Sequence, residues 1–261
     1  MTERDVAIET RGGAIWITLN RPEALNAITP DIIAGISSAL DRAENDPEIQ
    51  AIVLTGTGRA FCAGADLKFV RSTSEDPAAV SRFLNSFLRL LERIEAFPRP
   101  FIAAINGLAL AGGLELVLCC DLVVAARSAR LGDAHANFGL LPGGGGSVRL
   151  PRKVGPTRAK YLLYTADFLP AEELAAWGLV NEVVDDADLV ATTERLVMKL
   201  CAKSSLVLRR MKALVNDGLE QPLDVALRQE LLASELHAFS HDMNEGLAAF
   251  EEKRKPKFLG R

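Results

Sequence analysis

One carboxylate, Glu115, stands in an otherwise apolar stretch that runs from Phe101 to Cys120. Moving an ionised carboxylate into apolar surroundings is so costly that such a group usually becomes protonated, finds a partner, or holds a raised pKa that serves chemistry. The pair Gly112-Gly113 comes just before it, where a short helix is expected to follow a buried strand at 101–105. A helix start presents unpaired N–H groups, so the Gly112 amide can donate to a negative oxygen with Glu115 one turn away.

Two other interpretations of this stretch require no site. A run of about 20 apolar residues can mark a membrane span, but glycines, Asn106 and Glu115 interrupt this one, and the sequence has no second such segment. Glu115 can also simply pair with an arginine in a soluble core, which is the commonest fate of a buried acid. The second alternative stays open at the level of the sequence.

Another glycine-rich junction lies earlier in the chain. The β-branched, apolar segment 51–55 has the character of a central strand, and the chain then reaches the small residues Ala63, Gly64 and Ala65. Small side chains let a ligand approach the backbone closely. A mobile connector is the alternative. Two such junctions, each after a buried strand, would supply two converging amide donors, which is the outline of an oxyanion hole.

Seven segments of the chain, in order, resemble the crotonase, or enoyl-CoA hydratase/isomerase, superfamily. They are Asn20–Ala27, Ala60–Leu67, Ala103–Gly107, Gly112–Leu116, Cys120–Asp121, Leu140–Gly143 and Glu251–Phe258. The resemblance implies an α/β fold in which residues 1–190 form a spiral of ββα repeats that carries the acyl-CoA site. It further implies that residues 191–261 form a helical trimerisation region, and that the protein assembles as a homotrimer or a dimer of trimers.

The resemblance also assigns binding residues. Crotonases bind an acyl-CoA thioester and polarise its carbonyl with two backbone amides, which here fall on Ala65 and Gly112. An amide aimed at a developing enolate oxygen acts most strongly away from water. Coenzyme A belongs to the substrate, so no separate cofactor and no metal ion are expected. The residues placed along the coenzyme A path are Ala24, Ala63, Asp66, Leu67 and Lys68, which bind substrate together with the amides of Ala65 and Gly112. Lys68 has an ordinary alternative as an exposed cation.

The chain departs from the family at one catalytic position. Hydratases of the family use two glutamates to position a water and move protons; Glu115 matches the first, and the second position carries His135. A histidine near its ordinary pKa can give or take a proton at neutral pH, so acid–base chemistry survives the exchange in principle. The alternative is that His135 only forms a hydrogen bond within its loop, with Asp133 as partner. Isomerases that rely on a single carboxylate at the second position are disfavoured.

Hydration of a 2-enoyl-CoA is the function that the resemblance favours. Glu115, with His135, would hold a water that adds to the β-carbon while the α-carbon is protonated. Isomerisation, ring cleavage and thioester hydrolysis through the same enolate stay open, as does a non-catalytic crotonase-fold protein that binds CoA esters or RNA. Neither the acyl group nor the pathway follows from the sequence.

Composition agrees with an α/β domain plus an appended subdomain, since the chain has 261 residues and is 49% hydrophobic. A net charge of -4 and a pI near 5.6 disfavour general nucleic-acid binding. The four cysteines lack metal or redox spacing, which predicts reduced thiols in a cytoplasmic protein. The segment Met1–Asp5 is too polar and too short for a secretory or transit peptide.

The element pattern is α/β in the first two thirds and helical thereafter. Strands are expected at 6–9, 14–19, 51–55, 101–105 and 122–125. Thr29 and Asp76, each followed by proline, are expected to cap helices that run toward Ala43 and Ala96. Strands that alternate with helices argue for an α/β class. After Asp188 the expected helices cover 189–201, 205–216, 222–238 and 244–253.

Three further motifs carry weaker signals. Gly143–Ser147 lacks the lysine and hydroxyl ending of a phosphate loop, so a flexible or close-packed turn is expected. His237 and His241 have a spacing that can place two ligands on one helical face, but no third ligand is evident. The basic segment Lys253–Lys257 is expected to be a solvated tail; the resemblance allows it a contact with coenzyme A phosphates.

Overall fold

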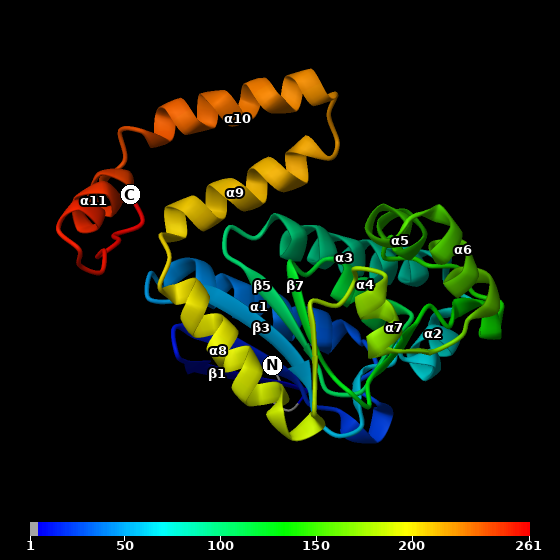
Figure 1. Ribbon diagram of the computed structural model, residues 1–261. Coiled ribbons are helices and arrows are strands. Elements are labelled where there is room, and N and C mark those ends of the chain that lie inside the picture. Colours follow the sequence, from blue (N-terminus) through cyan, green and yellow to red (C-terminus); the bar gives the residue numbers. More distant parts are fainter. Residues whose placement is uncertain (1–4) are drawn as a thin grey trace.

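The computed structural model describes residues 5–261 and contains two sheets (Figure 1). The larger sheet has six strands in the order β1-β2-β3-β5-β7-β10. β1 is antiparallel to β2, and every other neighbouring pair is parallel. All five predicted strands are confirmed, and β10 was not predicted. The strands are β1 (Val6–Arg11), β2 (Ala14–Leu19), β3 (Ala51–Gly56), β5 (Phe101–Ile105), β7 (Leu122–Ala126) and β10 (Glu182–Val184).

The smaller sheet consists of short strands that the sequence did not predict: β4 (Ala60–Cys62), β6 (Leu108–Leu110), β8 (Arg130–Gly132) and β9 (Leu169–Pro170). β4, β6 and β8 are parallel, and β9 runs antiparallel to β8. The pairs β3/β4, β5/β6 and β7/β8 each give one strand to the larger sheet and the next to the smaller one. This confirms the expected spiral of ββα turns.

Two long helices begin at the predicted caps. The hydroxyl of Thr29 accepts a hydrogen bond from the amide of Ile32, and the carboxylate of Asp76 accepts one from the amide of Ala78. The helices that follow are α1 (Pro30–Asn45) and α3 (Pro77–Ala96).

The remaining helices of the body are shorter, and of these only α4 was predicted. They are α2 (Leu67–Thr73), α4 (Gly112–Leu118), α5 (Gly146–Val154), α6 (Pro156–Thr165), α7 (Ala171–Ala176) and the 3-10 turns η1 (Pro22–Ala24), η2 (His135–Phe138) and η3 (Asp186–Asp188).

The chain after η3 is helical, as predicted, with α8 (Leu189–Cys201), α9 (Ser205–Gly218), α10 (Leu223–His237) and α11 (His241–Glu251). α8 packs against β5 and β7, whereas α9, α10 and α11 extend away from the body (Figure 1). Lys212 on α9 anchors this arm, because its Nζ donates to Asp121 Oδ2 at 2.8 Å. The predicted boundary between the body (1–190) and the oligomerisation region (191–261) stays a prediction.

Two sequence expectations for the arm need correction. α11 begins at His241 and not at Asn244, because Ser240 caps it and its Oγ accepts from the amide of Met243. His237 ends α10 and His241 opens α11, so the two histidines do not share a helical face. Within residues 5–261, no helix combines the length and the apolar character that crossing a bilayer requires.

Candidate active site

The residues that the sequence singled out for chemistry follow the three parallel strands of the smaller sheet. The segment 63–66 follows β4, Gly112 comes two residues after the end of β6, and Asp133 follows β8 directly. The carboxyl ends of parallel strands meet at one edge of a sheet, which is where open α/β sheets place their ligands. The fold therefore brings the two glycine-rich junctions and the His135 segment to a common edge.

The first junction (63–65) and the second junction (112–113) pack backbone against backbone. A Cβ on Gly64 would lie 2.8 Å from the Cβ of Ala111 and 3.2 Å from the amide nitrogen of Gly112. A Cβ on Gly113 would lie 2.0 Å from the carbonyl oxygen of Cys62. Only residues without a side chain allow this approach. Within residues 5–261, the amides of Ala65 and Gly112 donate no hydrogen bond to another residue, so both are available to a ligand.

The helix that begins at Gly112 starts from an unusual backbone conformation. Ala111 has φ 49° and ψ -118°, which L-residues rarely adopt. Such conformations cost about 1–3 kcal/mol and persist only where the surrounding structure enforces them, most often at functional sites. Here the β6 ladder fixes one side of Ala111, and the seven buried residues of α4 fix the other.

Asn26 holds the first junction in place, and sequence reasoning did not single it out. Its side chain is fully buried; Nδ2 donates to the carbonyls of Thr57 and Ala60 at 3.0 and 2.8 Å, and Oδ1 accepts from the amide of Arg21 at 2.8 Å. Asn26 also has a positive φ of 56°. A buried asparagine in this conformation indicates a structural role, but only the structure reveals the conformation.

Glu115 is buried, with 2% of its surface exposed, and its carboxylate is held by backbone amides. Oε1 accepts hydrogen bonds from the amides of Gly144 and Gly146, each at 2.8 Å. Within residues 5–261 Glu115 forms no ion pair, so the alternative of a core salt bridge with an arginine is not what the structure shows. Oε2 accepts no hydrogen bond within residues 5–261. It keeps contact with solvent, because Arg11 Nε is the side-chain polar atom of that range that is both buried and without a hydrogen-bond partner.

The environment of Glu115 raises its pKa. Burial is the largest cause; the amides of Gly146 and Gly144 and the positive charge of His135 act in the opposite direction, and the charge of Asp133 adds to the rise. A buried carboxylate with a raised pKa is a typical acid–base group.

His135 forms a pair with Asp133. Its Nδ1 lies 3.0 Å from Asp133 Oδ1, and the two side chains are 12% and 2% exposed. Burial alone would lower the pKa of His135, but the hydrogen bond to Asp133 and the charges of Asp133 and Glu115 outweigh it and raise the pKa above its ordinary value. Asp133 therefore orients the ring, and Nε2 remains without a partner within residues 5–261.

The other residues expected to bind substrate lie around the first junction. Asp66 caps α2, where Oδ1 accepts from the amides of Lys68 and Phe69, and its Oδ2 pairs with Arg21 at 3.1 Å. The Lys68 and Leu67 side chains are exposed. Ala63 donates its amide to the carbonyl of Leu25 at 3.0 Å, next to Ala24, the last residue of η1. Asp66 thus has a structural task beside any role in binding.

The segment Gly143–Ser147 is not merely a flexible or close-packed turn. Two of its amides hold Glu115, a role that sequence reasoning missed because backbone donors leave no mark on residue type. Cys62 is close to the first junction, but burial raises its pKa to about 12. It therefore stays a neutral thiol near pH 7 and is not a candidate nucleophile.

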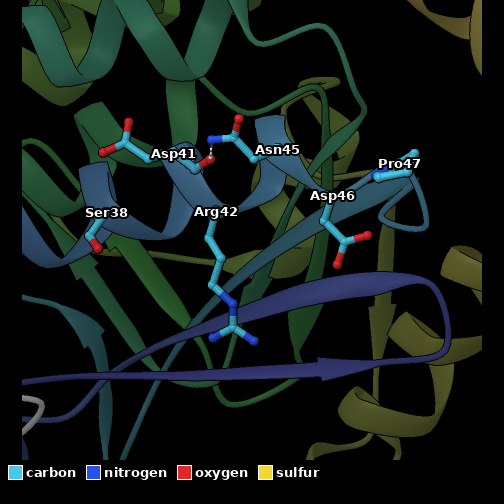
Figure 2. A pocket seen from close by; sticks show the side chains of 6 residues that line it. All are labelled: Ser38, Asp41, Arg42, Asn45, Asp46 and Pro47. Atoms are coloured by element: carbon cyan, nitrogen blue, oxygen red, sulfur yellow. Dashed lines mark hydrogen bonds between the residues drawn. The ribbon is translucent and has the colours of Figure 1, made fainter.

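A surface hollow of about 630 Å³ lies elsewhere, along the C-terminal half of α1 (Figure 2). It is open to solvent, and Asn45 Nδ2 donates there to the carbonyl of Asp41. It contains none of the candidate site residues described above. The lining residues are Ser38, Asp41, Arg42, Asn45, Asp46 and Pro47.

Comparisons with known proteins identify the family of the chain. Residues 9–261 match the family model described as enoyl-CoA hydratase/isomerase. The chain belongs to the enoyl-CoA hydratase/isomerase family. This crotonase chain is 37% identical to the crotonyl-CoA hydratase of Syntrophomonas wolfei over 100% of both chains. It is also 37% identical to the 1,2-epoxyphenylacetyl-CoA isomerase of Escherichia coli, over 95% of this chain and 96% of that one.

Solved structures confirm the crotonase fold. The enoyl-CoA hydratase of Bacillus anthracis superposes with a TM-score of 0.94 at 34% identity, covering 98% of this chain and 100% of that one. Hydratases and isomerases occur among the relatives at equal identity, so family membership alone does not choose the reaction.

Proposed function

We propose that this crotonase is an enoyl-CoA hydratase that adds water across the double bond of a 2-enoyl-CoA thioester. The observation that carries the proposal is the state of Glu115: a buried carboxylate with one oxygen fixed by two amides and the other unpartnered, in electrostatic contact with His135. Such a group suits the activation of a water beside a polarised thioester.

The proposed reaction uses each group once. The amides of Ala65 and Gly112 donate to the thioester oxygen, which becomes an enolate oxygen as water attacks the β-carbon. Glu115 Oε2 takes one proton from that water, and the protonated His135 gives one to the α-carbon as the enolate collapses. The two groups then exchange protons with solvent after the product leaves. The thioester bond stays intact throughout.

The coenzyme A part of the substrate would follow the first junction. Ala24, Ala63, Asp66, Leu67 and Lys68 lie together there, and the small residues leave the backbone open to a ligand. Lys68 is exposed and offers a cation for phosphate groups.

We also propose that the protein is a cytoplasmic homo-oligomer, a trimer or a dimer of trimers. α10 has no buried residue, although it contains several leucines and a valine, all of them exposed. Large exposed apolar surfaces on a chain often mark a site of contact with another protein. A second copy of the chain would cover these side chains.

An isomerase is the second candidate, and the relatives named as isomerases favour it. In that reaction Glu115 or His135 would move a proton between two carbons of the same enolate, and no water would enter the product. The His135–Asp133 pair argues for the hydratase, because a protonated histidine can supply the α-carbon proton while Glu115 activates water.

Product mass distinguishes the candidates. The protein is incubated with short, medium, branched and aromatic 2-enoyl-CoAs, and the products are identified by mass spectrometry. A hydratase gives a product that is heavier by one water with the parent protein and not with Glu115→Gln. A shifted double bond at constant mass would establish the isomerase, and ligand binding without turnover would contradict both.

A further inference from the structure

The loop that holds Glu115 is itself held by an ion pair. Gly144 is fixed on both sides: its amide donates to Glu115 Oε1 at 2.8 Å, and its carbonyl accepts from Arg149 NH1 at 2.8 Å. Arg149 lies on the first turn of α5, the helix that begins at Gly146, the second amide donor to Glu115. One guanidinium therefore contacts the segment that positions the acid–base carboxylate.

Arg149 is in turn fixed by Glu95 at the C-terminal end of α3. Its Nε and NH2 donate to Glu95 Oε2 at 3.1 and 2.9 Å, and its side chain is 14% exposed. Charge-assisted bonds of this kind are stronger and more directional than neutral ones. The guanidinium also lies against Gly145, where a Cβ would be 2.3 Å from NH1. Gly145 has φ +93°, so this position favours glycine for both reasons.

We propose that Arg149, held by Glu95, is a positioning residue for the reaction: it fixes the segment Gly144–Gly146 and thereby aims Glu115 Oε2 at the substrate. This inference rests on the proposed role of Glu115. Arg149 touches no reacting atom and acts through the amides that Glu115 accepts. A displacement of about 1 Å in a reacting group can cost about 100-fold in rate.

The same helix offers a matched control. Arg152 also lies on α5 and also pairs with a glutamate, Glu220, at 3.2 Å. Its side chain is 55% exposed, and its other hydrogen bond goes to the carbonyl of Val148, outside the glycine segment. Loss of Arg152 removes a comparable side chain from the same element without loosening Gly144.

The experiment measures kcat and KM for hydration by Arg149→Met, Arg149→Lys, Glu95→Gln and Arg152→Met, with unfolding followed by circular dichroism. We expect Arg149→Met to lower kcat about 10- to 100-fold with KM nearly unchanged. Arg152→Met should match the parent. Parent-like kcat in Arg149→Met, or an equal loss in Arg152→Met, would overturn the inference.

Two variants separate position from charge. The charged groups that face Glu115 are Arg149, His135 and Asp133. If only the charge of Arg149 mattered, Lys would restore the rate and Glu95→Gln, which removes a negative charge, would not reduce it. We expect both variants to lower kcat, and to move the acid limb of the pH profile upward, since looser amide bonds stabilise the carboxylate less. Parent-like kcat in both would overturn the inference, even if Arg149→Met failed to fold.

The inference and the proposed function fail separately. If Glu115→Gln hydrates as fast as the parent, the proposed function is wrong whatever Arg149 does. If Glu115→Gln is inactive while Arg149 and Glu95 variants keep the parent rate, only the positioning role is wrong.

Discussion

At the scale of single residues, Glu115 shows how one buried carboxylate is kept usable. Two amides donate to Oε1 and so reduce the free-energy cost of burying the charge, while Oε2 stays free of partners. The sequence alone pointed to Glu115, since it is the one charge in an apolar run. The amides of Gly144 and Gly146 could not be foreseen, because a backbone donor has no side-chain signature.

Replacing Glu115 by Gln should separate activity from stability. Gln keeps an oxygen that can accept from Gly144 and Gly146 but cannot take a proton from water, so turnover should fall about 100- to 10,000-fold. The raised pKa means that the folded state binds this proton more readily than the unfolded state does. Ionised Glu115 therefore lowers the free energy of unfolding at neutral pH, and this cost vanishes as pH falls below the ordinary value of 4.5.

The measurement is Tm for both proteins across pH. We expect Glu115→Gln to melt no lower than the parent near neutral pH, with any advantage shrinking under acidic conditions. A Tm of Glu115→Gln well below that of the parent at neutral pH, or an advantage of the variant that grows in acid, would contradict this account of Glu115.

The pH dependence of kcat/KM should be a bell with both limbs displaced upward. Glu115 acts ionised, so the acid limb lies above 4.5; His135 acts protonated, so activity is lost at a pH above 6.5 as that proton leaves. The two values belong to the interacting pair. Asp133→Asn weakens the support for protonated His135 and should move the alkaline limb downward. A limb that does not move in Asp133→Asn would exclude His135 as the acid.

At the scale of elements, the site exists because three short parallel strands end at one edge. β4, β6 and β8 have three residues each, too few for any periodicity to be recognised in the sequence. The long helices α1 and α3 were predictable because Thr29-Pro30 and Asp76-Pro77 are clear start signals. The residue pattern suggested that the two glycine-rich junctions supply converging amides, and the family resemblance assigned those amides to Ala65 and Gly112, but the short strands that bring them together were not predicted.

Gly144 should not tolerate alanine. A Cβ there would lie 2.6 Å from Leu91 Cδ1 and 2.8 Å from Glu115 Oε2, so the carboxylate must shift. We expect Gly144→Ala to lower kcat about 100-fold. Gly218→Ala is the control, because its Cβ meets only Ala226 at 3.6 Å. Steady-state kinetics checks both variants. An active Gly144→Ala would show that the segment Gly144–Gly146 tolerates a displacement that the structure does not indicate.

Asn26 should matter for stability. Asn26→Ala leaves the carbonyl of Thr57 and the amide of Arg21 without a side-chain partner, and it removes one of the two donors to the buried carbonyl of Ala60, which keeps Asn106 Nδ2 at 3.1 Å. The free energy of unfolding should fall by about 2–3 kcal/mol, measured by urea denaturation. Asn45→Ala, which removes an exposed bond to the carbonyl of Asp41, should cost much less. Equal costs for the two variants would contradict the structural role of Asn26.

At the scale of the whole molecule, α9, α10 and α11 form an arm at one end of the fold (Figure 1). Several large apolar side chains of this arm are exposed. The sequence predicted these helices from their periodicity. It could not show that α10 and α11 lie away from the body, because an apolar helical surface has the same sequence pattern whether it packs on its own chain or on another. On α10 the exposed apolar residues are Leu223, Val225, Leu227, Leu231, Leu232 and Leu236.

The assembly can be weakened at one of these positions. Leu231→Glu places a charge among the exposed leucines of α10, and burying that charge against a second copy would be costly. Light scattering during gel filtration should give a multiple of 28.1 kDa for the parent and a smaller mass for the variant. The exposed Gln229→Glu serves as control. A parent mass of one chain would contradict the proposed oligomer.

The most direct test of the central claim is hydration in water enriched with oxygen-18. The protein is mixed with a short 2-enoyl-CoA, and the product is fragmented in the mass spectrometer to locate the label. We predict one labelled oxygen on the β-carbon of an intact thioester, and no label with Glu115→Gln. Label in a free carboxylic acid, or an unlabelled product with a shifted double bond, would contradict the hydratase account.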